Sequence, residues 1–245
     1  MFGASSLEIE DNLARLDKTL AGLFAYIDKK VGLANTLIVL SADHGQPEVP
    51  GHLHLRGIKS AHYFDVESLD RAPAIAALKK QFGIGKELIE TFFFPYLYLH
   101  REVIREQGLD QEEVEQAVAA ELIKFKGVAY AVSSSALGKA NLPDNLLIRS
   151  ILRNFHARRS GDIYLVFEPN VFINDFDGLT VASTHGSPWR YDTFVPVYFA
   201  GAGLPAAEVD RPVTPYDIAP TLASFLKVKP PSAAIGNPLL EVLAQ

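Results

Sequence analysis

The chain has 245 residues, a formal net charge of -6 at pH 7, 48% hydrophobic residues and no cysteine. These values suit one large packed α/β domain, or one domain with an insertion, and they exclude disulfides, thiolate metal ligands and a cysteine nucleophile. The negative charge argues against nucleic acid as the main partner, and no apolar run approaches the about 20 residues that a membrane span needs.

The first predicted element is a long amphipathic helix. Apolar residues recur at three- and four-residue spacing from Ser5 or Ser6 to Lys30, and Gly32 ends the helix. A short apolar run, Leu37 to Leu40, follows and predicts a buried strand. Helix, short loop and strand together form an α/β unit.

Two residues that commonly bind metal ions, Asp43 and His44, come directly after this strand. In open α/β sheets, ligands bind beyond the carboxyl ends of strands. Neighbouring strand residues point to opposite faces, so both side chains reach one ion only if the strand has already turned into a loop, which Gly45 permits. The alternative is that Asp-His-Gly only closes the strand as a turn. Taken alone, the segment leaves both interpretations open.

The rest of the chain alternates short helices and strands. Helices are predicted at 70–82, 110–124, 143–156 and 214–226, and strands at 128–132, 162–167 and 195–200. Residues 90–100 are predicted to form either a pair of strands or one strand bent at Pro95. Asp110 and Thr214 are the predicted N-caps of their helices. Residues 46–60 are predicted to form a loop.

Three histidines in or near this loop, His52, His54 and His62, are a second candidate for metal binding. Alternate histidines can reach an ion from one face of a strand. We favour the interpretation that they belong to a solvated loop, because short motif matches are usually accidental.

Four segments in a fixed order resemble the alkaline phosphatase superfamily, most closely its type I phosphodiesterase/nucleotide pyrophosphatase-like group. They are Ser-Ala-Asp-His-Gly at 41–45, Ser-Thr-His-Gly-Ser-Pro at 183–188, Tyr-Asp-Thr with Val-Pro-Val at 191–197, and Asp-Ile-Ala-Pro-Thr-Leu at 217–222. Four motifs in order are far more specific than any one of them. The resemblance is weakest between about residues 61 and 159.

The resemblance implies a metal-dependent hydrolase of phosphoric esters, either a phosphatase or a phosphodiesterase, whose substrate is a small-molecule phosphate ester. It also implies two divalent metal ions, expected to be zinc, with Asp43 and His44 on one ion and His185 on the other. Carboxylate and neutral imidazole suit zinc. A metal pair about 4 Å apart stabilises both the attacking and the leaving oxygen of phosphoryl transfer.

The chain also departs from the family pattern. No Ser or Thr matches the position of the family's nucleophile, so we predict no catalytic residue in this chain. The family's other ligands, including an Asp-x-x-x-His motif, precede the helix that begins here just after Met1-Phe2-Gly3. We therefore expect a C-terminal half that is inactive alone, with the N-terminal half as its candidate partner. A non-catalytic truncated module, and a sulfatase or phosphonate hydrolase of the same superfamily, remain the alternatives.

The resemblance further implies an α/β fold with an alkaline-phosphatase-like three-layer core, a mostly parallel sheet that is partial here, and an inserted α+β cap subdomain. Residues 1–60 and 160–245 would form the core, and residues 61–159 the cap-like subdomain. Relatives of this kind are often periplasmic or secreted, so we expect the same localisation.

Overall fold

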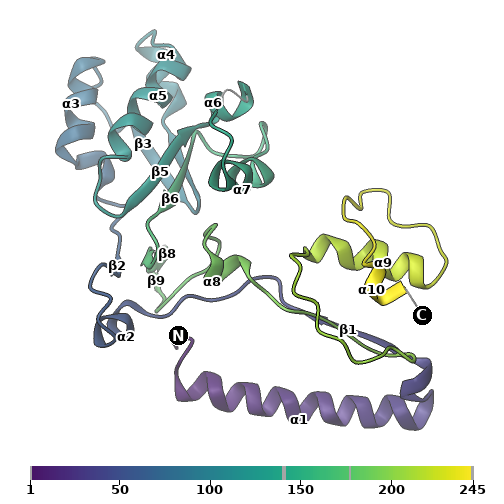
Figure 1. Cartoon of the computed structure of the whole chain (residues 1–245). Coiled ribbons are helices and arrows are strands. Elements are labelled where there is room, and N and C mark those ends of the chain that lie inside the picture. The colour runs from purple at the N-terminus through teal and green to yellow at the C-terminus, as the bar shows by residue number, and fades with distance from the viewer. Residues whose placement is uncertain (1, 140–141, 177, 244–245) are drawn as a thin grey trace. The chain divides into compact units, whose positions relative to one another are not determined.

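The computed structural model describes residues 2–139, 142–176 and 178–243, and it divides into two compact units (Figure 1). Unit 1 comprises Met1–Ser6 and Gln46–Thr193, and unit 2 comprises Leu7–Gly45 and Phe194–Gln245. Met1, the first residue of the Met-Phe-Gly segment, lies outside the described residues. Each unit is described below by itself.

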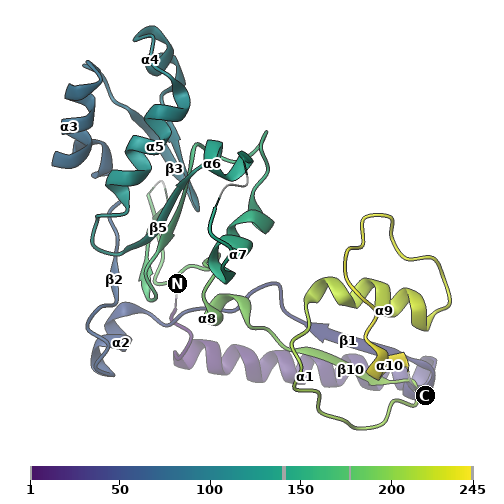
Figure 2. The ribbon, with the colours of Figure 1, turned by 45° about the horizontal axis from the view of Figure 1, so that its top comes forward.

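Unit 2 combines a long helix with a two-stranded ribbon. Helix α1 spans Leu7–Lys30, as the apolar spacing predicts, and none of its residues is buried. After the short 3-10 helix η1 (Leu33–Asn35), strand β1 (Leu37–Ser41) pairs antiparallel with β10 (Val197–Gly201) (Figure 2). The unit ends with η3 (Pro215–Asp217), α9 (Ile218–Phe225) and α10 (Leu240–Leu243).

A four-stranded antiparallel sheet with the order β3-β4-β6-β5 organises unit 1. Its strands are β3 (Ile89–Phe93), β4 (Tyr96–Leu99), β5 (Val128–Ser133) and β6 (Ile163–Phe167). The β3-β4 hairpin turns at Phe94 and Pro95, where the sequence predicts a bend. Every residue of β6 is buried, which explains its unbroken apolar run.

Helices cover both faces of this sheet (Figure 1). One face packs against α3 (Pro73–Gln81), α4 (Arg101–Glu106) and α5 (Gln111–Leu122), and the other against α6 (Ser134–Lys139) and α7 (Leu146–Asn154). Because strand side chains alternate, Ile163 and Leu165 of β6 enter the first cluster while Tyr164 enters the second.

Shorter elements complete unit 1. They are α2 (Pro50–Leu55), β2 (His62–Tyr63), η2 (Leu69–Arg71), β7 (Val171–Phe172), β8 (Asp175–Phe176), β9 (Leu179–Thr180) and α8 (Arg190–Thr193). The prediction that residues 46–60 form a loop is wrong in part, because these residues contain α2. Helices α4 and α6 are likewise additional to the predicted elements.

The α/β class is confirmed, and the strand pairing is partly rather than mostly parallel. Among the described strands, β2 and β7 pair in parallel and the other pairs are antiparallel. Direct hairpins such as β3-β4 impose antiparallel pairing, whereas parallel pairs need long crossovers. Strand β6 pairs with β4 and β5, so one sheet joins residues from both sides of the predicted boundary at 159/160. The division into 1–60, 61–159 and 160–245 stays a prediction.

Candidate metal centre

Strand β1 of unit 2 leads directly to Asp43 and His44. Ser41 Oγ donates a hydrogen bond of 2.9 Å to the carbonyl oxygen of Pro196, which ties the end of β1 to the chain entering β10. Beyond this tie, the Asp43 side chain is 90% exposed and that of His44 is 36% exposed. The strand therefore presents a carboxylate and an imidazole at its carboxyl end, as the sequence predicts.

Hydrogen bonds set the orientation of the His44 ring. Its Nδ1 lies 2.7 Å from the carbonyl oxygen of Gly45. Because a carbonyl only accepts, Nδ1 must donate, and in the neutral ring Nε2 then carries the lone pair. Histidines that bind metals usually donate their other ring N–H in this way.

The distance between Asp43 and His44 also suits a shared ion. Asp43 Oδ1 accepts the backbone N–H of His44 at 3.1 Å, and Oδ2 lies 3.7 Å from His44 Nε2. Two ligands about 2.1 Å from a tetrahedral zinc lie about 3.4 Å apart, so only a small adjustment is needed. The donor set fits one divalent cation.

His185 lies in unit 1, on an irregular segment that is anchored before it. Gln46 Nε2 donates to Ser183 Oγ at 3.0 Å, and the Tyr63 hydroxyl donates to the Ala182 carbonyl at 2.7 Å. Both bonds join the segment to residues far away in the sequence. These two hydrogen bonds therefore hold the chain just before His185 in place.

A buried carboxylate anchors the same segment after His185. Asp192 Oδ2 accepts hydrogen bonds from both the backbone N–H and the hydroxyl of Ser187, at 2.8 and 2.6 Å. Trp189 Nε1 donates to the Phe167 carbonyl of β6 at 2.9 Å. The backbone carrying His185 is thus held on both sides, while His185 itself is exposed.

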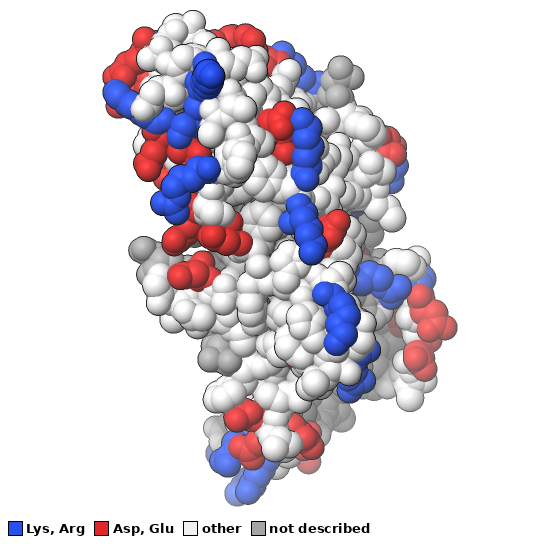
Figure 3. Space-filling model, turned by 90° about the vertical axis from the view of Figure 1, so that its left-hand side faces the viewer, with Lys and Arg blue, Asp and Glu red and all other residues white. Residues whose placement is uncertain are grey.

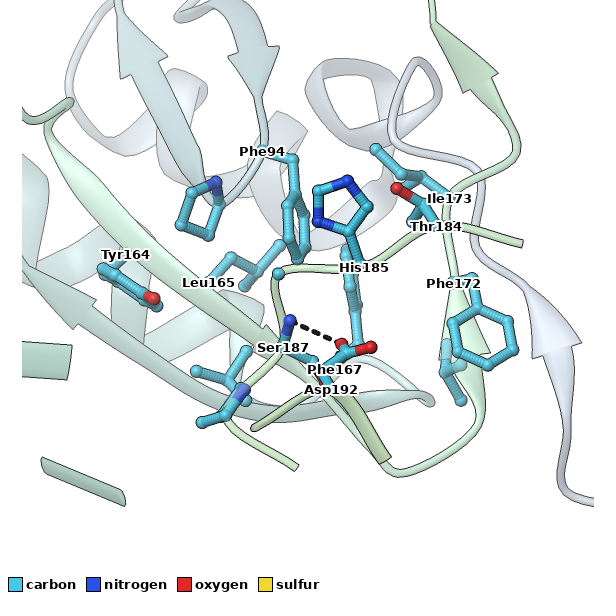
Figure 4. Close-up of a pocket in the computed structure, with 15 residues that line it drawn as sticks. Phe94, Tyr164, Leu165, Phe167, Phe172, Ile173, Thr184, His185, Ser187 and Asp192 are labelled. Atoms are coloured by element: carbon cyan, nitrogen blue, oxygen red, sulfur yellow. Dashed lines mark hydrogen bonds between the residues drawn. The ribbon is translucent and has the colours of Figure 1, made fainter. Parts of the chain in front are cut away.

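Aromatic rings pack beneath this segment, around a cavity of about 20 Å³ that His185 helps to line (Figure 4). Phe94 stacks on Phe167 with 6.3 Å between ring centroids and 13° between ring planes. Gly186 has φ of 104°, and a Cβ there would lie 2.8 Å from Phe94 Cε1. Only glycine lets the ring approach this closely. A cavity of this size holds about one water molecule, so it is a packing site rather than a substrate pocket.

The three predicted ligands are divided between the units. Asp43 and His44 belong to unit 2 and His185 to unit 1, so their convergence on one centre stays a prediction. Within the described part of the chain, no group of three or more His, Asp or Glu side chains is arranged to hold a metal ion.

The other three candidate histidines have their rings engaged locally. The ring partners are the Ala61 carbonyl for His54 (2.6 Å), the Ser60 carbonyl for His62 (2.7 Å) and Arg56 Nε for His52 (3.1 Å). These contacts favour the interpretation that the histidines stabilise the chain around α2 rather than a metal ion.

Asp217, in the fourth motif, has a structural role in unit 2. It is buried, and its carboxylate accepts the backbone N–H groups of Thr214 and Asn237, both at 2.8 Å. Burial favours the neutral acid, but these hydrogen bonds together outweigh it and hold the pKa of Asp217 below its ordinary value. The ionised carboxylate thereby ties the start of η3 to the chain before α10.

Comparison with known proteins identifies the family of this chain. Residues 1–188 match the model of the family described as type I phosphodiesterase / nucleotide pyrophosphatase. The chain is 33% identical over 245 residues to alkaline phosphatase PafA of Elizabethkingia meningoseptica, covering 100% of this chain and 43% of PafA. It is 34% identical over 244 residues to a protein of Myroides odoratus named calcium-transporting ATPase, again covering 100% of this chain and 43% of the relative.

Comparison of the fold with solved structures also matches the chain to PafA. The crystal structure of wild-type PafA matches with a TM-score of 0.83 and 33% identity, covering 98% of this chain and 44% of that one. The chain therefore spans less than half the length of the relatives it matches. No helix within the described residues has the length and apolar character needed to cross a membrane.

Proposed function

Because this chain belongs to the type I phosphodiesterase / nucleotide pyrophosphatase family, we propose that it forms part of a metal-dependent hydrolase of phosphoric esters. Several relatives, PafA among them, are named alkaline phosphatases, and these names support phosphate esters rather than sulfates or phosphonates as the substrate class of this chain. The observation that carries the proposal is the Asp43–His44 pair, with a carboxylate oxygen 3.7 Å from a ring nitrogen that holds a lone pair.

In this proposal, Asp43 and His44 bind one divalent ion and His185 binds the other, with zinc as the expected metal. Gly45 fixes the tautomer of His44, and Asp192 with Ser187 holds the backbone that carries His185. When bound, such an ion pair stabilises the negative charge on the attacking and leaving oxygens of the phosphoryl group.

The same proposal assigns no nucleophile to this chain. Three ligands shared between two ions leave each ion with at most two protein donors, whereas zinc sites normally use three or four. We propose that the 245 residues alone bind zinc weakly and do not turn over substrate. The remaining ligands and the nucleophile would come from a partner segment equivalent to the rest of a relative.

Unit 2 offers surfaces on which such a segment would pack. Helix α1 has no buried residue, and the outer edges of the β1-β10 ribbon make no strand pair among the described residues. Open edges and apolar helix faces favour association with further chain. Placement in the periplasm or outside the cell is proposed from the family resemblance alone.

A chimera tests the proposal directly. This chain replaces the matched 44% of PafA, and zinc-dependent hydrolysis of a chromogenic phosphate monoester is measured. The chimera should be active, His185→Ala and Asp43→Asn should each abolish most of that activity, and the control His156→Ala, at another exposed histidine, should not. Full activity in the His185→Ala chimera would overturn the ligand assignment.

Calorimetry of the isolated chain supplies the second test. Titration with zinc should show only weak binding that Asp43→Asn and His44→Ala remove. Two tight sites on the isolated chain, or turnover without a partner segment, would contradict the proposal that the centre is incomplete.

A further inference from the structure

A second cavity in unit 1 contains none of the proposed metal ligands. It has a volume of about 520 Å³ and lies where β4 meets α4, and its lining includes Lys86, Glu90, Arg158 and Arg159. Its size falls within the range of about 300–1,000 Å³ typical of small-molecule sites. Unlike the cavity near His185, it is large enough for an organic ligand.

Most charged groups that line this cavity are already neutralised by neighbours. Lys86 Nζ lies 3.0 Å from Glu106, and Arg101 Nε donates to Asp162 at 2.9 Å. Asp162 is only 1% exposed and also accepts the backbone N–H of Leu99 at 2.8 Å. In these bonds the charges of Lys86, Glu106, Arg101 and Asp162 are paired with one another. The face drawn in Figure 3 likewise shows basic and acidic side chains next to each other.

Arg158 and Arg159 are the exception. Both are exposed, and within the described part of the chain neither guanidinium group forms an ion pair. Guanidinium groups from two consecutive residues that line one cavity suit a doubly charged oxyanion, because each presents planar N–H donors to phosphate oxygens. Glu90, also without an ion pair among the described residues, lines the same cavity and is an acceptor for hydroxyl groups.

We propose that this cavity binds a small phosphate monoester that carries hydroxyl groups. Its phosphate lies on Arg158 and Arg159, and its hydroxyl-bearing part lies toward Glu90 and Tyr98. The site requires no metal and is separate from the proposed hydrolytic centre, so it goes beyond the proposed function. It gives unit 1 a binding activity of its own.

The test uses the full chain in the presence of a chelator, so that metal-held phosphate makes no contribution. Binding of ribose 5-phosphate, inorganic phosphate and ribose is measured by calorimetry at low salt. Ribose 5-phosphate should bind best, inorganic phosphate more weakly and ribose not at all. This order would separate a phosphate ester site from a site for free phosphate.

Variants assign the contacts. Arg158→Gln/Arg159→Gln should weaken binding of ribose 5-phosphate about tenfold or more, since it removes two charge-assisted contacts. Glu90→Gln should reduce the advantage of ribose 5-phosphate over phosphate, and the control Arg153→Gln, on exposed α7 surface, should change little. Equal binding by the double arginine variant and the wild type, or no saturable binding of ribose 5-phosphate, would overturn the proposal. Neither result bears on the metal centre.

Discussion

The two units use apolar residues in opposite ways. Unit 1 holds all of the largest fully buried side chains, arranged in two clusters on the faces of the β3-β4-β6-β5 sheet. Unit 2 contains α1. The apolar residues of α1 recur at regular three- and four-residue spacing, although none of them is buried. Apolar periodicity therefore predicts that a face is made to be covered, but it does not say which surface covers it.

The largest expected difference lies in the cost of removing a leucine side chain. Leu97 of β4 is 0% exposed, so Leu97→Ala should lower the free energy of unfolding of unit 1 by about 3 kcal/mol. Leu16 of α1 is 49% exposed, and Leu16→Ala should change stability by less than about 0.5 kcal/mol. Urea unfolding followed by hydrogen exchange in β6 and α1 measures both. Equal losses would mean that α1 is packed as tightly as the sheet.

Removing Asp70, which forms a half-buried ion pair in unit 1, ranks next. Asp70 accepts the backbone N–H groups of Leu88 and Ile89, both at 2.8 Å, and pairs with Lys79 Nζ at 2.5 Å. Asp70→Ala leaves these donors without their acceptor and should cost about 2–3 kcal/mol. Thermal unfolding at neutral pH measures the loss. A loss of stability as small as that from substituting an exposed residue would show that water accepts the Leu88 and Ile89 N–H groups in place of the carboxylate.

The same carboxylate makes stability depend on pH. Burial favours its neutral form, but the hydrogen bonds from Lys79, Ile89 and Leu88 together outweigh burial and hold the pKa of Asp70 below its ordinary value. The stabilisation is therefore complete above the unfolded pKa of about 3.9 and is lost as pH falls through the lower folded value. Melting temperatures from about pH 6 to about pH 3 should fall more steeply for wild type than for Asp70→Asn.

A smaller effect is expected where unit 1 supports His185. Gly186→Ala places a Cβ against Phe94 at a backbone angle that favours glycine, and should destabilise unit 1 by about 1–3 kcal/mol. Adding Phe94→Leu should recover the part due to the clash and leave the part due to the backbone. Thermal unfolding of the two single variants and the double variant separates them. Strict additivity would argue against the Phe94 contact.

The smallest loss predicted from removing a single hydrogen bond concerns unit 2. Thr214 Oγ1 lies 3.1 Å from Asp217 Oδ2, and Thr214→Val removes this hydroxyl while keeping the shape of the side chain. We expect a loss of about 0.5–1 kcal/mol. Faster hydrogen exchange at the Asn237 amide, which donates to the same carboxylate, would report it. Unchanged exchange would mean that the backbone bonds to Asp217 suffice.

Local signals allowed much of the fold to be predicted. Asp110 caps α5 as expected, with Oδ1 accepting the Glu113 N–H at 2.9 Å, and the apolar run at 162–167 is the buried strand β6. Helix α2 was missed because its sequence, Pro-Gly-His-Leu-His-Leu, has weak helix propensity and depends on burial of Leu53. The order of strands in the sheet depends on contacts distant in sequence, which periodicity does not encode.

The candidate site likewise has one part that local sequence signals predict and one part that they do not. The adjacency of Asp43 and His44 after a strand is visible in the sequence, whereas the carbonyl that sets the His44 tautomer is a matter of loop geometry. The contact of Phe94 with Gly186 joins segments far apart in the chain, and no local pattern in the sequence predicts it. The supporting side chains of the site therefore do not follow from local sequence patterns.

Trp189, four residues after His185, is the single tryptophan of the chain. Its indole N–H donates a hydrogen bond to the backbone of β6. Intrinsic tryptophan fluorescence consequently originates from unit 1 alone. An emission spectrum would record melting of that unit and any rearrangement near the 183–188 segment, whereas hydrogen exchange at the amides of α1 would record fraying of α1. Tryptophan fluorescence and hydrogen exchange on the same sample would thus report on unit 1 and on α1, respectively, without any label.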